Sequence, residues 1–520
     1  MKHSSLGKHR PHLALRLGFA MLVVIGSHEA AAAPPVPPVN ANVNGVWGPL
    51  GNWPLIAIHS ILTRDGRVLT FGTDGEGAQT GRFIYDVWNP RLANDNVSAA
   101  HNTLDNFTAT DIFCSAHVLL PGSNSVLIAG GDLYQDGQTL NVGNSDANLF
   151  SGNDNDLMPD GSGSMKRARW YGTTITLVNG ETYIQGGRGS GDSTTAGNLR
   201  PEVRNLNGAY RELSNINTSS LSFYYPRNYV APNGRVFGYD EKGYTYFLSP
   251  NLGSITFTGR LPTTGGNGGN RSRSATSVMF APGKILNFGG PTNGSNIIDI
   301  NGVKQKVTPS GKLVNPRRWV TGTVLPNGEV LATGGSKGES ADRAIVTGVE
   351  NRAEIWNPVT GKWGVKAPAA VPRLYHSTAL LLPDATVLVA GGGANKEGLT
   401  NRLNAQLYYP PYLFGAGGVY ASRPLITSAP QTISPGQKFP VDVSDAGSIA
   451  RVTVVKTGAV THSFNMSQRF VEFPFTRAGN TLTVTANAKP GVLPPGAYML
   501  FVLNSQGVPS EAEIISVKVA

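Results

Sequence analysis

The chain of 520 residues contains one cysteine, Cys114. A single cysteine excludes an internal disulfide, so the fold must be stabilised by packing or by a metal rather than by a disulfide framework. Long hydrophobic runs are also missing. Beyond the N-terminal region, no segment is long and apolar enough for a membrane helix. We therefore expect no membrane span in the body of the chain.

The sequence also lacks a stripe of lysines and arginines. The formal net charge is +10, and it falls to +7 if the first 33 residues, with four basic residues and Glu29, are removed. Spread over almost 490 residues, this charge gives a mildly basic surface. It does not predict nucleic-acid binding, although an attraction to acidic glycans is compatible with it.

The first 33 residues have the three parts of a secretory signal peptide. A basic segment is followed by the short apolar run "GFAMLVVIG" and by the small-residue cleavage site "EAAAAP". The apolar run is too short to span a bilayer. We predict cleavage near Ala33 and a secreted, periplasmic or cell-surface protein, with residues 34–44 as a Pro-rich lead. The alternative is a disordered basic tail.

Amphipathic helical patterns are scarce, whereas 64 glycines and 35 prolines separate many short apolar strands. Seven strand–turn–strand units recur, among them "HSILTRDGRVLTFG", "GTVLPNGEVLATGG" and "STALLLPDATVLVAGGG". Their closing glycines are 58, 56, 52, 51, 45 and 57 residues apart, at Gly72, Gly130, Gly186, Gly238, Gly289, Gly334 and Gly391. A period of about 50 residues is that of kelch repeats, with four strands in each blade of a β-propeller. The fold class is therefore all-β, with a seven-bladed kelch-type β-propeller over residues 45–421.

The pattern changes after residue 421. Segments such as "RVTVVKTG", "NTLTVTANA" and "YMLFVLNSQ" are alternating or apolar strands separated by Gly/Pro turns. About 100 residues of this kind predict a small immunoglobulin-like β-sandwich domain over residues 422–520.

Three blades carry a chemically special residue at the same distance from the closing glycine. Cys114 precedes its glycine by 16 residues, in a blade whose turn is one residue longer, and Tyr171 and His376 precede theirs by 15. Tyr375 stands beside His376. If these hairpins are the inner strands of the blades, the four side chains meet at one mouth of the central channel. The spacing thus predicts a site.

Two phenols, one imidazole and one thiol are compatible with copper, because tetragonal nitrogen and oxygen ligation suits Cu(II). A copper site needs a second histidine. In "VTVVKTGAVTHSFN", His462 follows a strand of the C-terminal domain after a Gly-Ala turn. A loop at this point could reach into the mouth of the propeller, which would explain why the small domain is attached.

These residues also resemble a known family. The segments "FCSAHVLL", "ARWYGTTITL", "RLYHSTALLLPD" and "VTHSFNMSQRF" are similar to the four active-site motifs of the copper radical oxidases, the galactose oxidase and glyoxal oxidase family, in the same order. The endings "AQLYYPPYLF" and "PPGAYMLFVLNSQGVPS" resemble the C-terminal region of that family. The resemblance covers almost all of the chain after residue 33.

The resemblance implies a role for each residue. Cys114 would be joined through its sulfur to the ring of Tyr171, a thioether cofactor formed with copper and oxygen. One copper ion would be bound by Tyr171, His376 and His462, with Tyr375 as the axial ligand and general base. The substrate loses two electrons, and copper accepts only one of them. An oxidised Tyr171 would accept the other. The protein would oxidise a primary alcohol or a small aldehyde with O2 and release hydrogen peroxide, acting as a monomer.

The sequence departs from galactose oxidases where they place a tryptophan over the cross-linked tyrosine. Here that position is Gly189, preceded by Arg188, and strand alternation should turn Trp170 away from the face of Tyr171. Trp319 shares the register of the predicted ligands, so we assign it and Arg188 to the substrate pocket. Galactose is therefore a poor candidate substrate, whereas small aldehydes and the primary alcohols of glycans both remain open.

Each residue also has a structural explanation. A lone buried cysteine is usually a small core residue, and lone tyrosines and histidines are usually packed or hydrogen-bonded. On this basis His117 is read as structural, and Arg317 is placed at the protein surface or at the rim of the pocket. The alternative function is a non-catalytic extracellular propeller that binds glycans or mediates adhesion, since one fold hosts many functions.

Overall fold

The structure is a computed structural model of the chain, and it describes residues 35–189, 200–262, 272–338, 347–394 and 400–519. The predicted signal peptide lies outside the described residues. Helices are rare in the described ranges, and none of them is long and apolar enough to cross a membrane. The helices are α1 (Ala41–Asn44), α2 (Pro90–Ala93) and the 3-10 turns η1 (Pro411–Leu413), η2 (Ala416–Gly418) and η3 (Ala446–Ser448).

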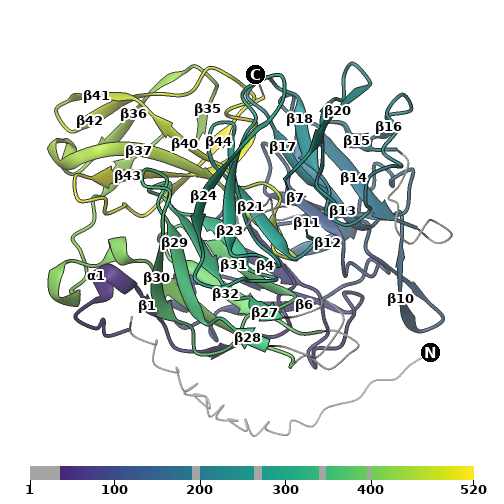
Figure 1. The fold of residues 1–520 in the computed structure, drawn as a ribbon, viewed down its shortest axis with the longest axis horizontal. Coiled ribbons are helices and arrows are strands. Elements are labelled where there is room, and N and C mark those ends of the chain that lie inside the picture. The colour runs from purple at the N-terminus through teal and green to yellow at the C-terminus, as the bar shows by residue number, and fades with distance from the viewer. Residues whose placement is uncertain (1–34, 190–199, 263–271, 339–346, 395–399, 520) are drawn as a thin grey trace, which may run out of the picture.

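Seven antiparallel sheets follow one another along the chain and form the blades of a propeller (Figure 1). Blade 1 contains β3 (His59–Leu62), β4 (Val68–Phe71), β5 (Ile84–Trp88) and β6 (His101–Asp105). Blade 2 contains β7 (Ala116–Leu119), β8 (Ser125–Ala129), β11 (Ala147–Ser151) and β12 (Asp156–Pro159). Blade 3 contains β13 (Trp170–Thr176), β14 (Thr182–Arg188), β15 (Glu202–Arg204) and β16 (Tyr210–Glu212). Blade 4 contains β17 (Arg227–Val230), β18 (Val236–Tyr239), β19 (Tyr244–Ser249) and β20 (Ser254–Arg260).

The remaining blades repeat this order. Blade 5 contains β21 (Ala275–Ala281), β22 (Lys284–Gly289), β23 (Gly294–Asp299) and β24 (Lys306–Lys312). Blade 6 contains β25 (Thr321–Val324), β26 (Val330–Thr333), β29 (Arg352–Trp356) and β30 (Trp363–Pro368). Blade 7 contains β31 (Ser377–Leu381), β32 (Val387–Gly391) and β33 (Asn404–Tyr409), with β1 (Val46–Trp47) and β2 (Gly51–Asn52) from the N-terminal end of the chain. Two small hairpins, β9 (Asp132–Gln135) with β10 (Gln138–Gly143) and β27 (Ser336–Gly338) with β28 (Thr347–Val349), stand outside the blades.

The first strands of the blades surround the propeller axis. Contacts join β3 to β7, β7 to β13, β13 to β17, β21 to β25 and β25 to β31, and β31 returns to β3. The ring is closed in blade 7, where Val46 pairs with Tyr409 and Gly51 pairs with Ala405. The seven-bladed propeller predicted from the sequence is confirmed, and its hairpins are the inner strands.

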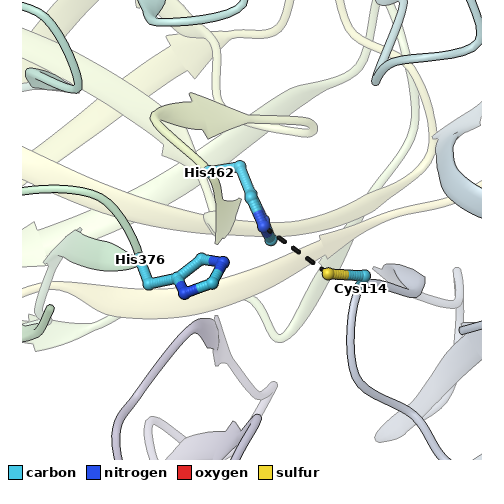
Figure 2. A group of neighbouring side chains, drawn as sticks. All are labelled: Cys114, His376 and His462. Atoms are coloured by element: carbon cyan, nitrogen blue, oxygen red, sulfur yellow. Dashed lines mark hydrogen bonds between the residues drawn. The ribbon is translucent and has the colours of Figure 1, made fainter. Parts of the chain in front are cut away.

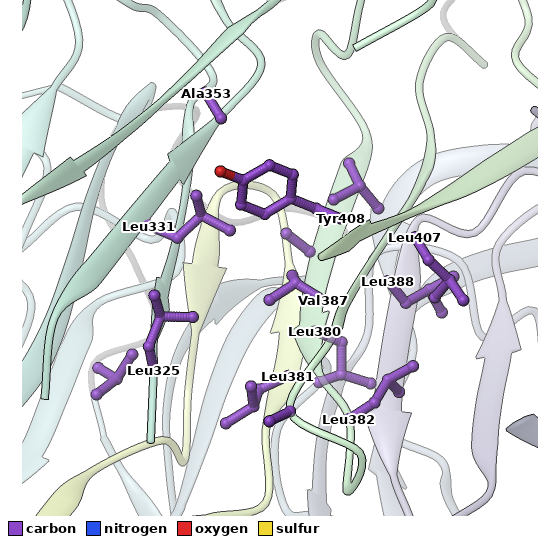
Figure 3. Packing of buried hydrophobic residues seen from close by; sticks show 14 of the residues in the cluster. Leu325, Leu331, Ala353, Leu380, Leu381, Leu382, Val387, Leu388, Leu407 and Tyr408 are labelled. Carbon is purple, nitrogen blue, oxygen red and sulfur yellow. The ribbon is translucent and has the colours of Figure 1, made fainter. Parts of the chain in front are cut away.

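Apolar layers between neighbouring blades form the largest part of the core. Figure 3 shows one of them, with Leu331 of blade 6 near Leu380, Leu381 and Val387 of blade 7, all at most 1% exposed. Each sheet is covered by a neighbour on both faces, which explains why the inner strands read as continuous apolar runs rather than as an alternating pattern.

In three blades, a buried arginine lies two residues before the aromatic residue that is predicted to belong to the site. These aromatic residues are Tyr171, Trp319 and Tyr375. Arg169 donates to the carbonyl of Gly186 at 2.6 Å and to the carboxylate of Glu202 at 2.8 Å, and Arg373 donates to the carbonyl of Gly391 at 2.9 Å. The third, Arg317, is fully buried and paired with Glu354 at 3.1 Å. Both locations predicted for Arg317, the surface and the pocket rim, are wrong. Its guanidinium instead satisfies backbone carbonyls and a carboxylate inside blade 6.

Replacement of Arg169 by methionine is expected to lower the free energy of unfolding by about 3–5 kcal/mol, because Glu202 would remain buried without its cation. Both side chains are fully buried. The measurement is guanidinium denaturation. The control is Arg211→Met, which removes a half-exposed ion pair with Glu181 and should change stability by no more than about 1 kcal/mol. Equal effects of the two substitutions would contradict the assignment.

The C-terminal strands form a sandwich of two sheets, which lies at the upper left of Figure 1. One sheet contains β34 (Ile426–Ser428), β36 (Lys438–Val443), β42 (Thr481–Thr485) and β41 (Phe475–Ala478). The other contains β35 (Thr432–Ile433), β44 (Glu513–Val517), β43 (Gly496–Asn504), β37 (Ile449–Lys456) and β40 (Phe470–Phe473). The predicted β-sandwich is confirmed, and it has its own apolar core.

One hairpin leaves the sandwich and joins the propeller. Strands β38 (Ala459–Thr461) and β39 (Phe464–Asn465) form it, and β38 pairs with β3, the innermost strand of blade 1. The register places Thr461 opposite His59. The turn of this hairpin, which contains His462, therefore lies at the propeller axis, as the sequence predicted.

Candidate metal centre

The predicted site residues share an unusual backbone conformation. The φ angles of Cys114, Tyr171, Trp319, His376 and His462 are 56°, 69°, 62°, 68° and 46°. Bulky residues rarely adopt positive φ, and such strain is concentrated at functional sites. In the four blades concerned, the chain turns sharply just as it enters the inner strand, so each side chain is aimed across the mouth.

Backbone hydrogen bonds pass from blade to blade at this level. The N–H of Tyr171 donates to the carbonyl of Cys114 at 3.0 Å, and the N–H of Tyr225 donates to the carbonyl of Tyr171 at 2.9 Å. The N–H of Cys114 in turn donates to Nε2 of His59 at 3.2 Å. Residues that are far apart in sequence are thus fixed relative to one another by hydrogen bonds of the backbone.

The two tyrosines and two histidines converge as predicted. The hydroxyl oxygens of Tyr171 and Tyr375 are 3.1 Å apart. The ring of His376 stacks on Tyr375 with centroids 3.7 Å apart, and the ring of His462 crosses that of His376 at 86° with centroids 4.6 Å apart. All four side chains are at most 7% exposed. The four side chains predicted to be ligands therefore lie together, and their roles as metal ligands stay a prediction.

Each imidazole uses Nδ1 for a hydrogen bond that orients the ring, so its Nε2 is the nitrogen that could bind a metal. Nδ1 of His376 donates to the carbonyl of Gly393 at 2.6 Å, which leaves the lone pair on Nε2, and that buried atom has no hydrogen-bond partner among the described residues. Nδ1 of His462 bonds to the hydroxyl of Thr461 at 2.6 Å. A hydrogen bond at the second ring nitrogen is the usual way to orient a metal-binding histidine.

Cys114 lies beside this group and is fully buried. Its sulfur is 3.7 Å from Nε2 of His462, and the ligand atoms of Cys114, His376 and His462 all lie within 4.8 Å of one another (Figure 2). Cys114 and Tyr171 are also joined by the backbone hydrogen bond described above and belong to the same buried cluster. The lone cysteine and the tyrosine predicted to be its partner are thus neighbours at the axis.

The electrostatics fit a cation. Burial raises the pKa of the Tyr171 hydroxyl well above its usual value, and burial with nearby Asp132 does the same for the Cys114 thiol. Burial lowers the pKa of His376 to about 3. The site therefore holds neutral imidazoles, which can bind a metal, and a Tyr171 phenol whose deprotonation a bound cation would favour. These residues fit a copper ion.

Comparisons with known proteins agree with this geometry. A family model described as galactose oxidase-like, Early set domain, matches residues 423–517. A galactose oxidase of Gibberella zeae is 27% identical to the chain, over 91% of the chain and 70% of the relative. The aldehyde oxidase GLOX of Vitis pseudoreticulata is 26% identical, over 89% of the chain and 96% of the relative.

A solved structure has the same fold. It is a fungal alcohol oxidase in complex with copper, with a TM-score of 0.78 and 24% identity, covering 91% of this chain and 99% of that chain. The resemblance to galactose and aldehyde oxidases is confirmed. The chain differs from galactose oxidases at Gly189, which stands where they carry a tryptophan, and at the preceding Arg188.

Trp170 occupies the place over Tyr171 that the sequence left unfilled. Its indole stacks on the ring of Tyr171 with centroids 4.1 Å apart and an interplanar angle of 27°. The prediction that strand alternation turns Trp170 away is wrong, because the φ angle of 69° at Tyr171 breaks the alternation there. Gly189 instead forms a backbone bridge with Gly143.

The two residues assigned to the substrate pocket lie at different depths. Trp319 is buried, and its ring meets that of Tyr375 at 61° with centroids 4.5 Å apart. Arg188 is opposite Trp170 on the neighbouring strand, and its guanidinium carbon lies 5.0 Å from the centroid of the indole and 5.1 Å from that of Phe223. Trp319 is therefore the nearer of the two to the tyrosine pair, and Arg188 forms a cation–π contact with the stack.

Replacement of Trp170 by leucine is expected to slow substrate oxidation about fivefold, because a stacked aromatic pair contributes about 1 kcal/mol beyond its buried area and this pair includes the ring predicted to react. Steady-state peroxide release would measure the change. The Arg188→Met protein is the matched control, since it keeps the ring stack and removes the cation. An unchanged rate for Trp170→Leu would contradict a role for the stack.

Sequence reasoning missed two residues that contact the centre. His59 receives the hydrogen bond of the Cys114 amide, and Tyr225 lies with its ring 4.9 Å from that of His462 and donates to the carbonyl of Ser115. Tyr225 is 13 residues before its closing glycine rather than 15, so the register argument did not find it. His59 is part of an inner strand and gives no signal in the sequence.

His117, read from the sequence as structural, is fully buried, and burial lowers its pKa from 6.5 to about 3. Above pH 6.5 this histidine does not make stability depend on pH. As pH falls from 6.5 towards 3, only the unfolded chain binds the proton, so the free energy of unfolding falls by about 1.4 kcal/mol per pH unit for this group. Between pH 6 and 4, the free energy of unfolding of the His117→Phe protein should therefore fall by about 1.4 kcal/mol less per pH unit than that of the wild type. Denaturation at several pH values tests it, and identical slopes would contradict it.

Proposed function

We propose that the chain is an exported copper oxidase that uses dioxygen to oxidise a primary alcohol or a small aldehyde and releases hydrogen peroxide. The observation that carries the proposal is the convergence of two phenol oxygens, 3.1 Å apart, with two imidazoles beside Cys114 at the propeller axis. Export is supported by the signal-like sequence of residues 1–33. The propeller over residues 45–421 would provide most of the site, and the sandwich domain over residues 422–520 would provide His462.

Copper, when bound, supplies a one-electron Cu(II)/Cu(I) couple. Four residues would hold it: Tyr171, Tyr375, His376 and His462. The backbone hydrogen bonds and positive φ angles described above hold these side chains in place. The donor set of two nitrogens and two phenol oxygens suits this metal better than a set of carboxylates would.

Cys114 and Tyr171 would form the second redox group. Bond formation between the sulfur and the ring removes two hydrogen atoms, one from the thiol and one from the ring, with dioxygen as the oxidant. Sulfur on the ring makes one-electron oxidation of Tyr171 easier. The ring can then accept one of the two electrons that leave the substrate.

The two tyrosines would divide the work on the substrate. Tyr375 takes the proton of the substrate hydroxyl as general base, and the oxidised Tyr171 takes a hydrogen atom from the adjacent carbon. Because their oxygens are 3.1 Å apart, both acceptors can flank one small substrate group. Dioxygen takes up the two electrons and two protons and leaves as hydrogen peroxide.

The walls of the site limit the substrate only broadly. Trp319 and the stacked Trp170 present indole rings beside the tyrosine pair. Such surfaces accept a small aldehyde hydrate or the terminal CH2OH of a larger molecule. Trp170 covers Tyr171 in place of the tryptophan that galactose oxidases carry at the position of Gly189, so the stack is kept although the residue that forms it differs.

A peroxide-release screen of the copper-loaded protein tests the proposal. The panel contains simple alcohols, small aldehydes, free sugars and glycans, and the Cys114→Ser protein is the matched control. We expect peroxide release from at least one aldehyde or primary alcohol, at a rate that the control does not reach. A copper titration without a tight site would contradict the proposal and favour a non-catalytic adhesion propeller.

A further inference from the structure

The loop that carries His462 begins and ends at two buried cations. Lys456 is the last residue of β37, and Arg469 directly precedes β40. Their side chains are 5% and 7% exposed. Since Val455 pairs with Phe470 and the N–H of Lys456 donates to the carbonyl of Arg469 at 2.9 Å, the two cations are direct neighbours across the strands. Like charges at such positions destabilise a sheet.

No carboxylate compensates for this pair. Neither side chain forms an ion pair in the part of the chain that the structure describes. Arg469 donates to the carbonyls of Gly491, Val492 and Val230, which carry no net charge. Burial and the nearby Arg469 lower the pKa of Lys456 to about 7. Because a buried ammonium without a counter-charge is unfavourable, Lys456 is charged in only about half of the molecules at pH 7, and an anion beside it would favour the charged form.

A small cavity adjoins both cations. Its volume is about 10 Å³, room for one particle of the size of a water molecule. Ser467 and Thr176 also line it, and their buried hydroxyl oxygens have no hydrogen-bond partner among the described residues. The two hydroxyls can donate to an occupant that the two cations attract. This set of groups excludes a metal cation and favours an anion.

We propose that this cavity binds a small monovalent anion, a halide such as chloride, between Lys456 and Arg469. The anion offsets one of the two buried positive charges at the base of residues 457–468, the loop that contains His462. Because the cavity is also lined by Thr176 and Asn228 of the propeller, the same anion ties the sandwich domain to blades 3 and 4. The site is independent of copper and of the proposed oxidase activity.

Crystals of the full chain soaked in sodium bromide test the site directly. We expect an anomalous difference peak within hydrogen-bond distance of Nζ of Lys456 and the guanidinium of Arg469, as strong as the best surface bromide peaks. Surface peaks without a peak at this position, or a water molecule there, would overturn the proposal. This test needs no substitution and no copper.

Thermal unfolding provides the matching test in solution. In the wild-type protein, bromide at about a hundred times its Kd should raise the midpoint by about 3 °C and then saturate. The Lys456→Met protein keeps the length of the side chain and should lose the saturable rise, whereas Lys456→Arg should keep it. The same bromide response in wild type and Lys456→Met would contradict the site. If Lys456→Met does not fold, the anomalous peak in the wild-type crystal still decides.

Discussion

The Cys114→Ser protein is expected to oxidise substrate at least about a thousandfold more slowly than the wild type, about 4 kcal/mol in the activation barrier. Serine is nearly isosteric with cysteine but cannot form a thioether with Tyr171. Without sulfur on its ring, Tyr171 is harder to oxidise by one electron, and the site loses its second redox group. The turnover number from peroxide release measures the effect.

The copper affinity of Cys114→Ser separates this account from direct ligation by sulfur. In the proposal the sulfur is bonded to Tyr171 and does not bind copper. The substitution should therefore change copper affinity by less than about tenfold, whereas loss of an outer-shell partner of a ligand typically costs about 10- to 100-fold. The sulfur is, however, 3.7 Å from Nε2 of His462, close enough for a thiolate to share a metal with it. A large loss of copper affinity, or retained turnover, would contradict the assignment.

Replacement of His462 by alanine is expected to weaken copper binding at least about a hundredfold, since loss of a ligand should exceed the 10- to 100-fold loss that follows removal of an outer-shell partner. His462 is one of two histidines in the centre, and it comes from the sandwich domain through the β38–β39 hairpin. Competition with a chelator of known affinity measures the change, and an unaltered unfolding midpoint without copper shows that the fold is kept.

The matched control for His462→Ala is Thr461→Val. It removes the hydroxyl 2.6 Å from Nδ1 of His462 and keeps the imidazole. Its copper affinity should fall by a smaller factor, about tenfold. If His462→Ala binds copper as tightly as the wild type, the sandwich domain does not contribute a ligand.

The fold and the common level of three predicted site residues could be predicted from spacing, whereas the ligand roles came from the resemblance to copper radical oxidases. Seven hairpins with the same closing glycine fixed the blades, and a constant distance from that glycine brought Cys114, Tyr171 and His376 to one level. This reasoning works because the blades are copies of one unit with inner strands of similar length. It failed for Tyr225, whose blade enters its inner strand two residues later relative to the glycine.

The environment of the ligands was harder to predict. The orientation of Trp170 depends on a positive φ at Tyr171, which no propensity of tyrosine indicates. The burial of Arg317 depends on Glu354, which is 37 residues away. The cations Lys456 and Arg469 become neighbours only when β37 pairs with β40. Each of these features depends on the local backbone conformation or on contacts with a distant segment. The sequence around each residue does not indicate them.

The most direct test of the account is peptide mass mapping of the wild-type protein after copper and air. The account predicts one peptide pair joined through Cys114 and Tyr171, lighter than the sum of its parts by two hydrogen atoms, and absent from the Cys114→Ser protein. Separate, unmodified peptides with a free Cys114 thiol after full copper loading would contradict it.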